Sequence, residues 1–178
     1  MFLESAWREG EYSVHEAIEL AGLLLIGVAI LGRMWCTLYI GGRKSQEIVA
    51  VGPYSLSRNP LYVFSTLAVA GVGLQTGSIL VGAILVAAAL AIFVPVIRRE
   101  EAALTAHFGP DYAAYMARVP RFGPRFANWT EPKIVEASPK LLWRTLRDTL
   151  PLFLAFPFCE AVEWMQASGY LEPLLRLP

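Results

Sequence analysis

Residues 61–97, LYVFSTLAVAGVGLQTGSILVGAILVAAALAIFVPVI, decide the fold because they contain no charged side chain. Residues 75–78, QTGS, divide this stretch into two apolar runs and have the composition of a tight turn. The second run, 79–97, is close to the length of about 20 residues that a helix needs to cross a bilayer, whereas the first, 61–74, is short for a full crossing. The stretch therefore predicts a helical hairpin whose two ends return to one side of a membrane.

Two more segments are candidates for membrane spans. Residues 17–40 form a largely apolar run that contains Arg33. The residues before this run are acidic rather than rich in Lys and Arg, so we expect it to remain as an anchor and not to be cleaved as a signal peptide. Residues 149–170 predict either a fourth full span or a broken, interfacial segment, because they contain four residues that a span disfavours: Pro151, Pro157, Glu160 and Glu163.

The polar stretch before this last candidate is predicted to be helical as well. Residues 98–117 show Leu and aromatic residues at helical spacing, with a Gly-Pro pair that breaks or kinks the helix. Residues 141–150 mix leucines with arginines and predict an amphipathic helix along the membrane interface. We expect an all-α fold in one domain, residues 1–178: an integral membrane bundle of about four transmembrane helices, with a central helical hairpin and a cytoplasmic helical segment.

Composition and charge limit the class of protein. Charged residues make up 17% of the chain and hydrophobic residues 56%, whereas about a quarter of the residues of an ordinary soluble domain are charged. The formal net charge is zero, so nothing indicates a nucleic-acid partner. Twelve of the fifteen basic residues lie in 41–60 and 98–148. Because basic loops remain in the cytoplasm, we expect a multi-pass protein with both of these polar segments on the cytoplasmic side.

Two polar blocks adjoin the hairpin, which brings them to the same side of the membrane. They are residues 52–62, GPYSLSRNPLY, and residues 100–122, EEAALTAHFGPDYAAYMARVPRF. Arg58 has the planar fork that binds a carboxylate, and the paired Glu100 and Glu101 can hold an ammonium or a ribose. Four tyrosines can wall an aromatic base or a sulfonium, which cation–π attraction favours: Tyr54, Tyr62, Tyr112 and Tyr115.

Each of these residues also has a simpler interpretation. Arg58 can anchor the chain at the lipid head groups, the glutamates can form a solvated charge cluster, and the tyrosines can belong to the aromatic belt of a membrane interface. Arg33, inside the first apolar run, either snorkels to the interface or pairs with Glu160 and Glu163, which share one helical face.

Several kinds of chemistry are excluded by what the sequence lacks. His15 and His107 are expected on opposite sides of the membrane and the two cysteines are isolated, so no metal-ligand cluster is predicted. No phosphate-binding glycine loop follows a predicted strand. We therefore expect a site built of Arg, Glu, Tyr and backbone groups at helix ends, without a metal.

The two blocks resemble the membrane methyltransferases of the isoprenylcysteine carboxyl methyltransferase family and the related phospholipid methyltransferases. The family's first pattern, Gly-x-Tyr followed by Arg-His/Asn-Pro-x-Tyr, matches at Gly52, Tyr54, Arg58, Asn59, Pro60 and Tyr62. Its later pattern matches at Glu100, Glu101, Phe108, Gly109, Tyr112, Tyr115, Val119, Arg121 and Pro124. The likeness covers about residues 31–124.

The resemblance implies a cofactor, S-adenosyl-L-methionine, bound at the cytoplasmic face, and a hydrophobic lipid or isoprenoid acceptor that enters from the bilayer. It implies neither a nucleic acid nor a metal as partner. Carried over by position, the cofactor-binding candidates are Tyr54, Arg58, Asn59, Tyr62, Glu100, Glu101, Tyr112, Tyr115 and Arg121. The catalytic candidates among them are Arg58, Asn59 and Glu101.

One departure from the family pattern bears on the acceptor. Asn59 stands where the eukaryotic carboxyl methyltransferases have histidine, and an amide is no general base near neutral pH. A carboxylate acceptor is already ionised and needs no base, so we favour it. The alternatives are methylation of a phospholipid amine, a membrane reductase that uses NADPH, and a membrane module without catalytic activity.

Overall fold

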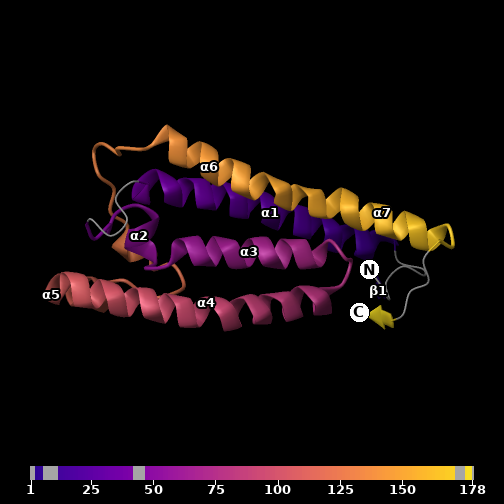
Figure 1. Ribbon diagram of the computed structural model, residues 1–178, viewed down its shortest axis with the longest axis horizontal. Coiled ribbons are helices and arrows are strands. Elements are labelled where there is room, and N and C mark those ends of the chain that lie inside the picture. Colours follow the sequence, from indigo (N-terminus) through magenta and orange to yellow (C-terminus); the bar gives the residue numbers. More distant parts are fainter. Residues whose placement is uncertain (1–2, 6–11, 42–46, 171–174, 178) are drawn as a thin grey trace. The chain divides into compact units, whose positions relative to one another are not determined.

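Helices dominate the computed structural model, which describes residues 3–5, 12–41, 47–170 and 175–177 (Figure 1). In chain order the elements are β1 (Leu3–Ser5), α1 (Tyr12–Ile40), α2 (Pro53–Leu56), α3 (Pro60–Leu74), α4 (Ile79–Phe108), α5 (Pro110–Arg118), η1 (Phe126–Asn128), α6 (Pro139–Thr149), η2 (Leu150–Leu154), α7 (Ala155–Ala167) and β2 (Leu175–Leu177). The expected helical class is confirmed. The sequence did not indicate the short parallel pairing of β1 with β2, in which Leu3 lies opposite Leu175.

The central helical hairpin consists of α3 and α4 (Figure 1). In the turn between them, Gly77 has a φ of 65°, and its N–H donates to the carbonyl oxygen of Leu74 at 3.0 Å. The two helices approach closely next to this turn, since a Cβ on Gly73 would lie 2.5 Å from the Cα of Gly82. Small residues at such a crossing let two helix backbones pack directly, as they do in membrane proteins.

The chain forms two compact units, and α1, α3 and α4 each contribute to both. The first unit contains Met1–Ala29, Thr66–Ala89 and Thr149–Pro178, and the second contains Ile30–Ser65 and Leu90–Asp148. In the first unit α1 packs on α3, where a Cβ on Gly22 would lie 2.7 Å from the carbonyl oxygen of Gly71. The second unit contains both polar blocks. A single domain over the whole chain stays a prediction.

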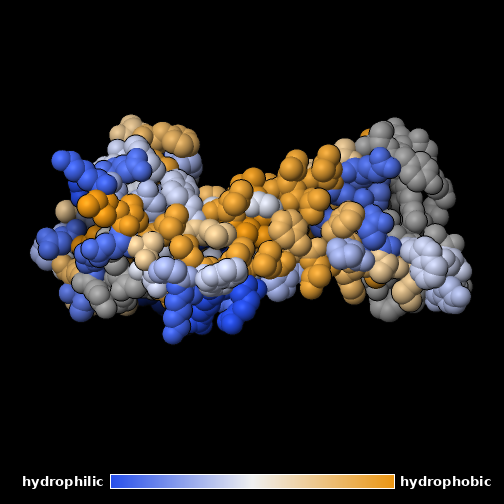
Figure 2. All heavy atoms as spheres, turned by 90° about the horizontal axis from the view of Figure 1, so that it is seen from above, coloured by the Kyte–Doolittle hydropathy of each residue, from blue (hydrophilic) through white to orange (hydrophobic). Residues whose placement is uncertain are grey.

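In the part of the chain that the structure describes, two helices are long and apolar enough to cross a membrane: Val14–Ile40 of α1 and Ile79–Phe108 of α4. Only 33% of the apolar window of α1 and 11% of that of α4 is buried, so most residues of both windows are not covered by protein. Figure 2 shows hydrophobic residues exposed over a broad area of one face. α3 has 15 residues, which at 1.5 Å per residue span about 22 Å, less than the hydrocarbon thickness of about 30 Å.

Whether the candidate fourth span, residues 149–170, crosses the membrane fully stays a prediction. Its first part, η2, is a 3-10 helix, and α7 has only 13 residues. Pro151 lies at the start of η2, where a missing N–H is tolerated. Glu160 is exposed, and the side chain of Glu163 lies outside the described residues.

The amphipathic helix α6 packs against α1. A Cβ on Gly41 would lie 3.5 Å from Cδ1 of Leu141, and Oγ1 of Thr145 lies 3.1 Å from Oγ1 of Thr37. One side of α6 therefore contacts α1, and its expected place along the membrane interface stays a prediction. The exposed face carries Trp143, Arg144 and Arg147.

Candidate active site

Two Gly-Pro pairs begin the short helices α2 and α5, which carry three of the candidate tyrosines. Gly52 has a φ of 57° and Gly109 a φ of 56°, a region that glycine adopts far more readily than other residues. The following proline takes the first helical position, where its missing N–H is tolerated. At Gly52 a side chain is also excluded by space, because a Cβ would lie 2.4 Å from the ring of Tyr39. The two Gly-Pro pairs therefore fix the residues at which α2 and α5 begin.

Residues 119–130, which we call the strap, hold the first polar block by backbone hydrogen bonds. The three bonds run from Arg58 N–H to Pro120 O at 2.9 Å, from Arg125 N–H to Leu56 O at 3.1 Å, and from Gly52 N–H to Thr130 O at 2.7 Å. Trp129 of the strap also stacks on Trp35 of α1, with ring centroids 5.9 Å apart. Since buried backbone groups require partners, the strap stabilises α2 in its position.

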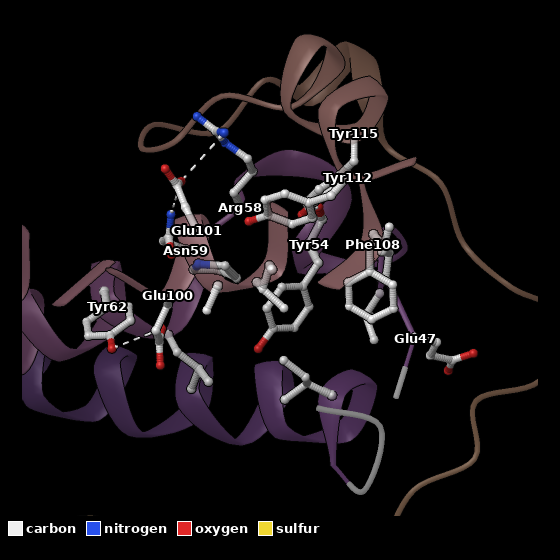
Figure 3. Close-up of a pocket in the computed structure, with 17 residues that line it drawn as sticks. Glu47, Tyr54, Arg58, Asn59, Tyr62, Glu100, Glu101, Phe108, Tyr112 and Tyr115 are labelled. Atoms are coloured by element: carbon white, nitrogen blue, oxygen red, sulfur yellow. Dashed lines mark hydrogen bonds and ion pairs between the residues drawn. The ribbon is translucent and has the colours of Figure 1, made fainter. Parts of the chain in front are cut away.

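Glu101 of α4 is the centre of a buried charge network (Figure 3). Only 6% of it is exposed. Its Oε2 accepts two hydrogen bonds from Arg121, at 2.6 Å from Nη2 and 3.0 Å from Nε. Its Oε1 lies 3.2 Å from Nδ2 of Asn59 and 3.6 Å from Nη1 of Arg58. A buried carboxylate needs such partners, so Glu101 fixes the two first-block side chains relative to α4.

Asn59 connects this network to the strap. Its Nδ2 donates to Glu101 and also lies 3.3 Å from the carbonyl oxygen of Arg121. The amide therefore uses its donor nitrogen to hold the carboxylate and the backbone in place. The geometry gives Asn59 a positioning role, consistent with an amide's lack of basicity.

Glu100 faces a different neighbour from Glu101. Oη of Tyr62 donates to Oε2 of Glu100 at 3.2 Å (Figure 3), and the Tyr62 ring packs edge-on against Phe93, with centroids 5.4 Å apart. Successive residues of a helix point about 100° apart, so one glutamate completes the arginine network while the other contributes to the α3 side of the site.

The three tyrosines of the short helices are buried and neutral. Burial raises the pKa of Tyr54, Tyr112 and Tyr115 above the ordinary value, and negative charge on Glu101 adds to the effect at Tyr112 and Tyr115. Their rings can therefore wall a ligand and their hydroxyls can hydrogen-bond without carrying charge. Oη of Tyr54 is buried and has no hydrogen-bond partner among the described residues.

A pocket of about 220 Å³ lies among these residues (Figure 3). Eight of the nine predicted cofactor-binding residues line it: Tyr54, Arg58, Asn59, Tyr62, Glu100, Glu101, Tyr112 and Tyr115. Arg121 is outside the lining and contacts Glu101 instead. The structure thus brings the two polar blocks together around one cavity, while the roles of the individual residues stay predictions.

Sequence reasoning missed part of the lining. Ile40 at the end of α1 and the following Glu47, Ile48 and Val49 also face the pocket. Nothing in that short segment has a recognisable motif, so no local signal pointed to it. Three further lining residues belong to α4: Ala103, Leu104 and Phe108. Their spacing predicted a helix but did not indicate that they face a pocket.

The lining fits a small ligand that carries both charges and an aromatic group. It combines one arginine, glutamates and several aromatic rings. Nε of Arg58 and Oη of Tyr54 are buried without a hydrogen-bond partner in the described part of the chain, and such atoms normally bond to a ligand or to water. Within residues 12–41 and 47–170, no three His, Cys, Asp or Glu side chains gather as metal ligands.

This helical protein, with its two polar blocks joined around one pocket, belongs to the phospholipid methyltransferase family, whose sequence profile matches residues 19–111. The chain is 41% identical over 156 residues to the cobalt-zinc-cadmium resistance protein CzcN of Cupriavidus metallidurans, covering 88% of this chain and 72% of that protein. It is 34% identical over 165 residues to the nickel-cobalt-cadmium resistance protein NccN of Alcaligenes xylosoxydans xylosoxydans, covering 93% of this chain and 77% of that protein. No solved structure matches the chain.

Proposed function

We propose that this protein is an integral membrane methyltransferase that uses S-adenosyl-L-methionine and methylates a lipid-like acceptor. The observation that carries the proposal is the pocket, where Arg58, Glu100 and several tyrosine rings line one cavity. The cofactor bears a carboxylate, an ammonium, a ribose and an adenine. In the lining, an arginine suits the carboxylate, a glutamate suits the ammonium or the ribose, and the tyrosine rings suit the adenine. Membership of the phospholipid methyltransferase family supports the same chemistry.

The residues of the pocket have distinct proposed roles. Arg58 binds the carboxylate of the cofactor, Glu100 accepts hydrogen bonds from its ammonium or ribose, and the rings of Tyr112 and Tyr115 enclose its base. Glu101 and Asn59 position Arg58 through the contacts described above. When bound, the cofactor supplies an electrophilic methyl group. Transfer of that group requires chiefly alignment and a water-poor site, which buried, neutral tyrosines provide.

The membrane arrangement is proposed from exposed apolar surface and from basic residues. α1 and α4 are the membrane-crossing helices, and α3 together with the segment η2–α7 contributes two shorter, embedded pieces, in keeping with about four spans. The basic residues of 41–60 and 98–148 put the pocket at the cytoplasmic face. An acceptor with a hydrocarbon tail then reaches the site along the inner leaflet, and tail burial contributes about 0.8 kcal/mol per CH₂.

Binding of S-adenosylhomocysteine to the detergent-purified protein tests the cofactor assignment. We expect Arg58→Ala and Glu100→Gln each to weaken binding tenfold to a hundredfold, because a hydrogen bond to a charged group is worth about 1.5–3 kcal/mol. Arg144→Ala is the matched control, since Arg144 is exposed on α6, outside the pocket lining. Unchanged affinity in both pocket variants, with the fold intact, would return Arg58 to the role of a head-group anchor.

Two other activities are separable in the same assay. A membrane reductase would bind NADPH and ignore S-adenosylhomocysteine, and a non-catalytic module would bind neither. An enzyme that methylates phospholipid amines would give an alkali-stable product, whereas the methyl ester of a carboxylate releases labelled methyl in mild alkali. We favour the carboxylate because the amide of Asn59 offers no base.

The printed names of the two relatives suggest a physiological setting. We propose that the methylated lipid contributes to resistance against divalent metal ions such as cobalt and cadmium. Deleting the gene should lower the concentration of these ions that stops growth, and the intact gene should restore it while the Arg58→Ala gene should not. If both the intact gene and the Arg58→Ala gene restore growth, resistance does not depend on cofactor binding.

A further inference from the structure

Arg33 is a charged residue inside the apolar part of α1 whose partner is not a carboxylate. Its Nη1 donates to Oγ of Ser65 on α3, and its Nε is buried without a hydrogen-bond partner among the described residues. An arginine in a membrane span is costly, and it normally marks a functional position with a polar or anionic partner. A serine hydroxyl satisfies one N–H but leaves the positive charge unbalanced.

Arg33 does not itself line the pocket, but it is linked to residues that do. Oγ of Ser65 also donates to the carbonyl oxygen of Leu61, one turn earlier in α3, at 2.7 Å, and Leu61 lines the pocket. On α1, Cys36 is one turn from Arg33 and packs against Tyr54. Arg33 is therefore connected to the α1 side of the cavity in two ways, through Ser65 and Leu61 on α3 and through Cys36 and Tyr54.

Tyr54 presents its hydroxyl on that side. Figure 3 shows its ring directed into the pocket, with Oη pointing toward the α1 ribbon. Tyr54 is only 5% exposed, and its Oη has no hydrogen-bond partner among the described residues. Burial raises the pKa of Tyr54, the neighbouring Cys36 and Tyr115 add to the rise, and the positive charge of Arg33 opposes it. The hydroxyl is thus neutral and can donate a hydrogen bond.

We propose that Arg33 and the Tyr54 hydroxyl form an anion subsite on the α1 side of the pocket that binds the carboxylate head of the acceptor. Its role in catalysis rests on the proposed function, but its binding preference does not. Arg58 is assigned to the carboxylate of the cofactor, so the acceptor requires a second cation. The two arginines divide the site into a cofactor side and an acceptor side.

The subsite predicts a specific preference among lipids of equal chain length. In a nonionic detergent, with S-adenosylhomocysteine present, calorimetry should show dodecanoate binding at least tenfold more tightly than dodecanol, and dodecylamine more weakly than either. Arg33→Met should remove the advantage of dodecanoate over dodecanol, and Arg33→Lys should retain part of it. Tyr54→Phe should weaken dodecanoate binding about tenfold to a hundredfold, the value of one hydrogen bond to a charged group. Arg144→Met is the matched loss of an exposed positive charge and should change nothing.

Each remaining outcome has a definite meaning. An unchanged dodecanoate preference in folded Arg33→Met, or a preference of the wild type for dodecylamine, would overturn the subsite. If dodecyl phosphate binds more tightly than dodecanoate and this depends on Arg33, the carboxylate assignment is overturned. If Arg33→Met does not fold, Arg33→Lys supplies the comparison, and full dodecanoate affinity together with an unchanged preference in both Arg33→Lys and Tyr54→Phe overturns the proposal. Failure of the wild type to bind S-adenosylhomocysteine would refute the cofactor assignment while leaving the lipid comparison intact.

Discussion

Tyr115 donates its hydroxyl to the carbonyl oxygen of Tyr54 at 2.8 Å, which joins α5 to α2 across a separation of 61 positions in the chain. Both residues are buried, so the bond is protected from water. It fixes the aromatic wall of the second polar block to the helix that begins the first. The pocket therefore depends on a hydrogen bond between a side chain and a backbone group. An aromatic ring without the hydroxyl cannot make this bond.

Tyr115→Phe should lower the free energy of unfolding by about 1–2 kcal/mol, because it removes the donor to a buried carbonyl oxygen and retains the ring. Chemical denaturation in detergent measures the change. Tyr170→Phe is the control, since Tyr170 is 73% exposed and its variant should be neutral. Equal stability of both variants would show that the Tyr115 bond contributes nothing.

The two helix-starting glycines provide a matched pair. Gly52→Ala and Gly109→Ala both place alanine at a φ near 57° with a ψ of −134° or −127°, a sparsely populated conformation that costs about 1–3 kcal/mol. Only at Gly52 does the new Cβ also meet the Tyr39 ring, whereas nothing lies within 4 Å at Gly109. Gly52→Ala should therefore be the more destabilising of the two in a thermal melt, and it alone should impair S-adenosylhomocysteine binding. A larger effect at Gly109 would contradict this placement of α2 against α1.

The raised pKa values of Tyr54, Tyr112 and Tyr115 predict how stability depends on pH. Unfolded tyrosine titrates near pH 10, so above that pH the unfolded state holds fewer protons than the folded state and the free energy of unfolding falls as pH rises. Below about pH 9 these phenols are neutral in both states and contribute no slope. Denaturation between pH 8 and pH 11 should show this break, and Tyr112→Phe should make the decline shallower. A slope in the wild type that Tyr112→Phe leaves unchanged would assign the effect to other groups.

Cysteine labelling checks the proposed orientation. With Cys36 and Cys159 replaced by alanine, a cysteine at Ser138 should react only with a reagent that reaches the cytoplasm, and one at Thr76 should react with an impermeant reagent from outside. The expectation follows from the basic residues around Ser138 and the uncharged turn at Thr76. The opposite labelling pattern would invert the topology and move the pocket to the outer face.

Local chemistry made much of this arrangement predictable. The uncharged stretch 61–97 predicted the α3–α4 hairpin, and the Gly109-Pro110 pair predicted the end of α4, which stops at Phe108. The order of residues in the two blocks indicated eight residues that line the pocket. In each case the signal lies within a few neighbouring residues, where helix periodicity and turn chemistry operate.

Long-range partners were not predictable in the same way. The contact of α6 with α1 left no local signal, because the side chains of Thr37 and Thr145 that meet there are 108 positions apart in the chain. Backbone bonds of the strap leave no pattern, because any residue offers the same N–H and C=O groups. For Arg33, the sequence predicted either snorkelling to the interface or a pair with Glu160 and Glu163. The structure shows instead a hydrogen bond to the hydroxyl of Ser65 on α3.

The strap also determines how much of the chain the site needs in order to be complete. The family profile ends at residue 111, yet the N–H groups of Gly52 and Arg58 bond to carbonyl oxygens of Thr130 and Pro120. A fragment cut at the profile's end would retain most of the pocket lining and lose the acceptors that complete it. A truncated chain that keeps this site complete must therefore extend through residue 130, so the structural unit that holds the pocket is longer than its sequence signature.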